Sequence, residues 1–167
     1  MIRRVAFKKA CIGGAAGALA WELAARVFLL AGVPVFDLVH VLGELALGDG
    51  AVFPLWWIAG LILHLTVGAI WAVFYAYFFW STLELPPYLQ GFVFSLFPAL
   101  LAGLIMVPQM DSMLDGAMQT FGLFANGMGL GGPIMIIGGH LIYGLVMGSI
   151  YKRPVGYPVG RRVAEYG

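Results

Sequence analysis

Charged residues are scarce in this chain. They make up 10% of its 167 residues, and hydrophobic residues make up 62%, whereas an ordinary soluble domain has about 25% charged residues. The composition therefore excludes a water-soluble globular protein. A net charge of only +1 excludes the basic surface that binds nucleic acid. The single cysteine, Cys11, excludes an internal disulfide.

Catalytic motifs are missing as well. The sequence has no nucleophile elbow, no phosphate-binding glycine loop, no Cys-x-x-Cys pair and no His-Glu-x-x-His segment. The apolar composition also leaves no soluble domain in which a catalytic cleft could form. We therefore expect that this protein is not an enzyme.

Long apolar runs are what the sequence has instead. The longest run, residues 53–80, contains no charge and only one histidine. A bilayer core of roughly 30 Å is crossed by about 20 apolar residues in a helix, so this run predicts a membrane span. Three other runs have the same character. We expect transmembrane helices at residues 11–33, 53–80, 89–107 and 133–151.

These spans predict an all-α integral membrane protein, a four-helix bundle in a single transmembrane domain at residues 1–152. Residues 34–52 are too short to cross and predict an amphipathic helix at the membrane interface. Residues 108–132, which are rich in glycine, predict an interfacial or re-entrant segment. Residues 153–167 predict a basic tail.

The basic residues predict the orientation of the chain. Of the nine Lys and Arg residues, four precede the first span and four follow the last, whereas residues 34–52 and 108–132 contain acidic residues and no Lys or Arg. Cationic segments remain on the cytoplasmic side. We therefore expect a multi-pass protein of the bacterial cytoplasmic (inner) membrane with both termini in the cytoplasm.

The first span contains the only charges within any span, Glu22 and Arg26. A spacing of four places them on one helix face, with the acid before the base in the favourable order. Either charge alone is costly near the bilayer centre. We interpret them as a structural ion pair, and the alternative is a relay for protons or ions.

Asp37, His40 and Glu44 share one face of the predicted interfacial helix because they are three and four residues apart. Carboxylates and an imidazole at this spacing could hold a divalent metal ion, but a second histidine is missing from the pattern. A solvated polar face is the simpler interpretation.

Two histidines lie within different spans. His64 is flanked at four-residue spacing by Gly60 and Gly68, and the face of His140 is extended by small residues that let helices pack closely. Two such histidines could be axial ligands of a b-type haem or bind a chlorophyll-type pigment. The simpler interpretation is that they form hydrogen bonds between helices, with no cofactor. The helix-packing residues on these faces are Gly60, Gly68, Tyr143, Gly144 and Gly148.

Three stretches of the sequence carry a resemblance. They are WWIAGLILHLTVGAIWAVFYA at residues 56–76, MVPQMDSMLDGAMQTFGLFANGMG at 106–129 and GGHLIYGLVMGSIY at 138–151. Together they resemble a family of small bacterial four-helix membrane proteins of unknown function, in which an HLIYG-type fourth helix is the most specific feature. The resemblance implies the same topology, and it implies importance for the two intramembrane histidines without assigning them an activity.

Three functional hypotheses remain open. The first is a non-catalytic accessory subunit that packs against other membrane proteins of a larger respiratory or photosynthetic complex, since the spans have aromatic and glycine residues on more than one side. The second is a four-helix bundle that binds haem or a pigment between His64 and His140. The third is a small transporter of ions or solutes that uses Glu22, Arg26 and the acidic residues of residues 34–52 and 108–132.

Overall fold

The computed structural model describes residues 5–33, 35, 37–48, 50–80, 82–113 and 121–151. Within these residues four helices are long and apolar enough to cross a membrane, which confirms the predicted all-α fold. The spanning helices begin with α1 (Phe7–Leu30) and α3 (Leu55–Phe74), which continues as the π-helical turn η1 (Tyr75–Phe79). They end with α4 (Pro87–Leu101) and α6 (Gly131–Ile150).

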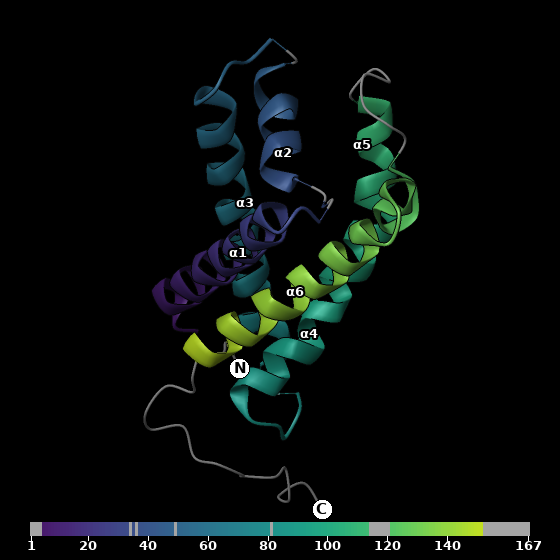
Figure 1. Cartoon of the computed structure of the whole chain (residues 1–167). Helices are drawn as coiled ribbons and strands as arrows, with labels where there is room; N and C mark the ends of the chain where they lie inside the picture. Colours follow the sequence, from purple (N-terminus) through teal and green to yellow (C-terminus); the bar gives the residue numbers. More distant parts are fainter. Residues whose placement is uncertain are drawn as a thin grey trace, which may run out of the picture.

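One side of the bundle contains α3 and the other contains α4, and α1 and α6 connect the two sides (Figure 1). Helix α1 contacts α3 and α6, and α6 also packs along α4. Between α3 and α4 the contacts are aromatic: the ring centroid of Trp71 lies 5.7 Å from that of Phe97 and 6.4 Å from that of Phe94. The main apolar core lies where the four helices meet and includes Tyr75 and Met147.

The short helix α2 (Leu38–Leu47) confirms the predicted helix after the first span. Asp37 caps it by accepting a hydrogen bond from the backbone N–H of His40 at 3.1 Å, and Gly48, with a φ of 85°, follows its last turn. The helix packs along α3. Gly60 of α3 permits this approach because its Cα faces the backbone of Val39.

The third span extends beyond its predicted end at residue 107. After α4 the chain forms a π-helical segment, η2 (Ala102–Met106), and then a further helix, α5 (Val107–Met113). Pro108 has no N–H to donate to the carbonyl of Leu104, one turn before it. A π-helical segment around that carbonyl accommodates the loss and lets the helix continue.

The predicted interfacial or re-entrant segment contains α5 and a 3₁₀ segment, η3 (Leu123–Met128). Segment η3 packs against α6 and η2, and Phe124 lies over Gly103. Phe124 and Ala125 have φ values of 53° and 58°, a left-handed conformation that is uncommon for residues with a side chain. The predicted basic tail, residues 153–167, lies outside the described residues.

Candidate functional site: an intramembrane cavity with two histidines

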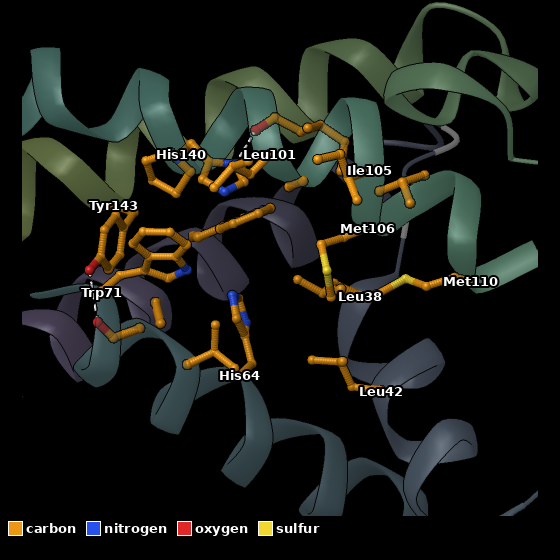
Figure 2. Close-up of a pocket in the computed structure, with 18 residues that line it drawn as sticks. Leu38, Leu42, His64, Trp71, Leu101, Ile105, Met106, Met110, His140 and Tyr143 are labelled. Carbon is orange, nitrogen blue, oxygen red and sulfur yellow. Dashed lines mark hydrogen bonds between the residues drawn. The ribbon is translucent and has the colours of Figure 1, made fainter. Parts of the chain in front are cut away.

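A cavity of about 390 Å³ lies between the two sides of the bundle (Figure 2). Its lining is almost entirely apolar and comes from every spanning helix and from α2. The exceptions are the imidazoles of His64 and His140, the hydroxyl of Tyr143 and two indoles. The lining includes Trp21, Leu38, His64, Trp71, Ile105, Met106, Met110, His140 and Tyr143.

His64 belongs to the buried stripe of α3. The buried residues of this helix are Gly60, His64, Gly68 and Ala72, and their four-residue spacing places them on one face. The imidazole is 4% exposed. Its Nδ1 lies 2.8 Å from Oε1 of Glu22 in α1, at ion-pair distance but without the alignment of an ordinary hydrogen bond.

His140 lies on α6 and is also buried. Its Nδ1 is 2.6 Å from the carbonyl oxygen of Ile136, one turn earlier. Because a carbonyl oxygen only accepts, Nδ1 carries the proton and donates this hydrogen bond. The other ring nitrogen, Nε2, is then an acceptor when the imidazole is neutral.

Trp21 of α1 packs against both histidines. Its ring centroid lies 5.0 Å from that of His64 and 4.6 Å from that of His140, and Gly139 leaves room for the indole. A haem ligated by both residues needs one imidazole on each face of a single flat ring. The indole contacts both imidazoles, so the described arrangement does not fit this haem site unless Trp21 moves.

A chain of charged groups leads away from His64. The carboxylate of Glu22 also lies 3.5 Å from the guanidinium of Arg26, as the helical spacing predicts. The closest partner of Arg26 is Asp37, with two N–O contacts of 2.7 and 2.8 Å. Arg26 therefore joins a buried carboxylate in α1 to the carboxylate that caps α2.

Asp37, His40 and Glu44 form two separate interactions. Asp37 pairs with Arg26, whereas Nε2 of His40 lies 3.0 Å from Oε1 of Glu44. The His40 ring packs at a tilt against Trp56, with the ring centroids 4.3 Å apart. In the part of the chain that the structure describes, no three His, Cys, Asp or Glu residues group as metal ligands.

The residues predicted for helix packing lie at close contacts. The hydroxyl of Tyr143 donates a 2.8 Å hydrogen bond to the carbonyl of Gly68, which joins α6 to α3 beside the cavity. Gly144 and Gly148 face Gly91 of α4. These contacts hold the helices that carry both cavity histidines.

Sequence reasoning missed Trp21 and the contact between Glu22 and His64. One signal was available for Trp21: it lies well inside a span, whereas membrane tryptophans are enriched near the interfaces. For Glu22 and His64 no local signal existed, because the contact joins residues on separate helices.

No protein-family model, curated protein or solved structure matches this chain. The predicted family resemblance therefore has no support beyond topology. What the sequence and the fold establish is an integral membrane protein with four apolar spanning helices.

Proposed function

We propose that this protein binds a lipid-soluble small molecule in the cavity between its helices. The observation that carries the proposal is a cavity of about 390 Å³ with an almost wholly apolar lining and two buried imidazoles. Small-molecule sites are typically apolar cavities of about 300–1,000 Å³ with a few polar groups that orient the ligand. This hypothesis develops the predicted cofactor-binding bundle without requiring a haem.

The two ends of the cavity differ in chemistry, which supports an amphipathic ligand. In Figure 2 His64, Trp71, His140 and Tyr143 lie toward one end. The other end is aliphatic and thioether-lined, with Leu38, Leu42, Ile105, Met106 and Met110. A polar ring fits the first end, and a hydrocarbon chain fits the second because apolar surfaces gain from mutual contact.

Two neighbouring residues of η2 provide a matched test. Ile105 lines the cavity and is 51% exposed, whereas Leu104 is 48% exposed and does not line it. Ile105→Trp should fill the cavity, and Leu104→Trp should add the same side chain elsewhere. Each protein is purified in mild detergent, its organic extract is analysed by LC–MS, and its uptake of decylbenzene into nanodiscs is measured.

We expect a stoichiometric lipid-soluble compound, or saturable decylbenzene uptake, in the wild type and in Leu104→Trp. Ile105→Trp should reduce either by about tenfold. The proposed function would be contradicted if Ile105→Trp and Leu104→Trp retained the compound and took up decylbenzene equally. It would also be contradicted if the wild type showed neither a bound compound nor saturable decylbenzene uptake.

Three further expectations stay predictions: the accessory-subunit hypothesis, the transporter hypothesis, and the inner-membrane location with cytoplasmic termini. The accessory-subunit hypothesis is tested by the proteins that co-purify in mild detergent, where a stoichiometric larger complex supports it. The transporter hypothesis would be contradicted if Glu22→Gln left transport unchanged.

A further inference from the structure

The two cavity histidines each have one ring nitrogen close to an oxygen atom of the protein. Nδ1 of His140 donates to the carbonyl of Ile136 at 2.6 Å, and Nδ1 of His64 lies 2.8 Å from the carboxylate of Glu22. Within the described residues, Nε2 of neither histidine has a hydrogen-bond partner. Because both side chains are more than nine-tenths buried and line the cavity, a ligand there is the natural partner for both Nε2 atoms.

His140 supplies an acceptor. Its Nδ1 proton is fixed by the carbonyl of Ile136, so Nε2 of the neutral ring has a free lone pair. A ligand that satisfies this nitrogen must carry an O–H or N–H donor.

His64 supplies a second hydrogen-bonding nitrogen. Its Nδ1 lies 2.8 Å from the carboxylate of Glu22, which leaves Nε2 as the ring nitrogen for a ligand. A hydroxyl group can both donate and accept a hydrogen bond, so it satisfies Nε2 whether or not this nitrogen carries a proton.

We infer that the cavity binds a lipid-soluble aromatic ring with a hydroxyl group and a second ring oxygen, the chemistry of an alkylated hydroquinone. One hydroxyl donates to Nε2 of His140, and the second oxygen, which is the other hydroxyl of a hydroquinone, forms a hydrogen bond with Nε2 of His64. The inference rests on the proposed function and adds the chemical class of the ligand.

The apolar lining agrees with the same ligand. The indoles of Trp21 and Trp71 border the histidine end, where a flat ring gains from aromatic contact. An alkyl tail extends toward Leu38, Met106 and Met110 at the other end (Figure 2).

The test uses the full chain in nanodiscs and three probes with the same tail: decylhydroquinone, decylquinone and decylbenzene. Binding is the excess of probe over empty nanodiscs at equilibrium. The wild type should bind decylhydroquinone about tenfold more tightly than decylbenzene, as expected for hydrogen bonds to buried imidazoles. Decylquinone, which has acceptors and no donor, cannot satisfy Nε2 of His140 and should bind more weakly than decylhydroquinone.

Replacement of either imidazole by a benzene ring, in His64→Phe or His140→Phe, should abolish the preference for decylhydroquinone and leave decylbenzene binding unchanged. Ile105→Trp should block all probes, and Leu104→Trp should block none. If His64→Phe does not fold, His140→Phe alone decides the result.

The two proposals fail in different ways. Equal affinity of the wild type for decylhydroquinone and decylbenzene, or a preference that survives in both histidine variants, overturns the hydroquinone inference and leaves the cavity as an apolar binding site. Binding of no probe overturns the proposed function as well. A Soret band on addition of haemin, lost in both histidine variants, identifies a porphyrin site and also overturns the hydroquinone inference.

Discussion

Glu22 is a carboxylate in the buried face of an apolar helix. It is 6% exposed, and its two oxygens lie near different partners, the imidazole of His64 and the guanidinium of Arg26. A lone acidic side chain near the bilayer centre costs at least about 2.5–3.5 kcal/mol. Its two partners offset this cost, so the interaction energy of the group depends on all three residues together.

Glu22→Gln should destabilise the protein, because the guanidinium of Arg26 and the imidazole of His64 both lose a charged partner. We expect the free energy of unfolding to fall by about 1–3 kcal/mol, measured by unfolding in mixed micelles of increasing SDS content. Glu84→Gln is the matched control, since Glu84 is exposed and a surface change should stay within about 0.5 kcal/mol. Equal effects of the two substitutions would show that the buried cluster contributes nothing to stability.

Tyr143→Phe removes one defined interaction between helices, the hydrogen bond from the Tyr143 hydroxyl to the carbonyl of Gly68. The same unfolding assay should show a loss of about 0.5–1.5 kcal/mol. Tyr88→Phe serves as the control because Tyr88 is 46% exposed. A Tyr143→Phe protein as stable as the wild type would mean that the hydroxyl finds an equally good partner in the unfolded state.

At the scale of whole elements, glycine sets the distance between α4 and α6. A Cβ atom at Gly144 would meet the backbone of Gly91 and the side chain of Ser95. Helices in a bilayer gain little from burying apolar side chains against each other, since lipid tails are equally apolar. Close backbone contact and van der Waals packing therefore hold these two elements together.

Gly144→Ala and Gly138→Ala test this contact on the same helix. A Cβ at Gly138 meets no atom within 4 Å, so this substitution should leave stability unchanged or raise it by up to about 1 kcal/mol through helix propensity. Gly144→Ala should lower stability by about 1–3 kcal/mol because the helices must separate. Both are measured by unfolding in mixed micelles, and similar values for the two would contradict close packing at Gly144.

At the scale of the whole molecule, the chain has two sides, α2 with α3 and α4 with α5, joined through α1 and α6. The spans were predictable because each needs a long apolar run, a property of consecutive residues. The helix α2 was predictable from its amphipathic spacing. The end of the third span was not, since Pro108 normally ends a helix and a π-helical segment carries the chain past it.

The candidate site was only partly predictable. His64 and His140 stand out as polar residues within spans, and the spacing of Glu22 and Arg26 indicates their contact. The cavity and the pairing of Glu22 with His64 depend on which helices become neighbours. That choice is made by long-range packing at glycines such as Gly14 and Gly68, which lie against each other in α1 and α3.

The predicted topology is testable with cysteines in exposed positions on opposite sides. In a Cys11→Ser background, Gly50→Cys lies between α2 and α3, and Glu84→Cys lies between η1 and α4. If both termini are cytoplasmic, a membrane-impermeant maleimide added to intact cells labels residue 50 alone. Residue 84 reacts only after the cells are opened. The reverse pattern would show that the positive-inside rule gives the wrong orientation here.

The double contact between Arg26 and Asp37 has an evolutionary consequence. One aspartate both caps a helix and neutralises an arginine on the preceding helix. A change at Arg26 removes the cation that pairs with Asp37, and a change at Asp37 leaves Arg26 with only the longer 3.5 Å contact to Glu22. Substitutions at Arg26 and Asp37 should therefore be correlated. Among proteins that descend from a common ancestor, loss of the arginine and loss of the aspartate should occur together far more often than expected by chance.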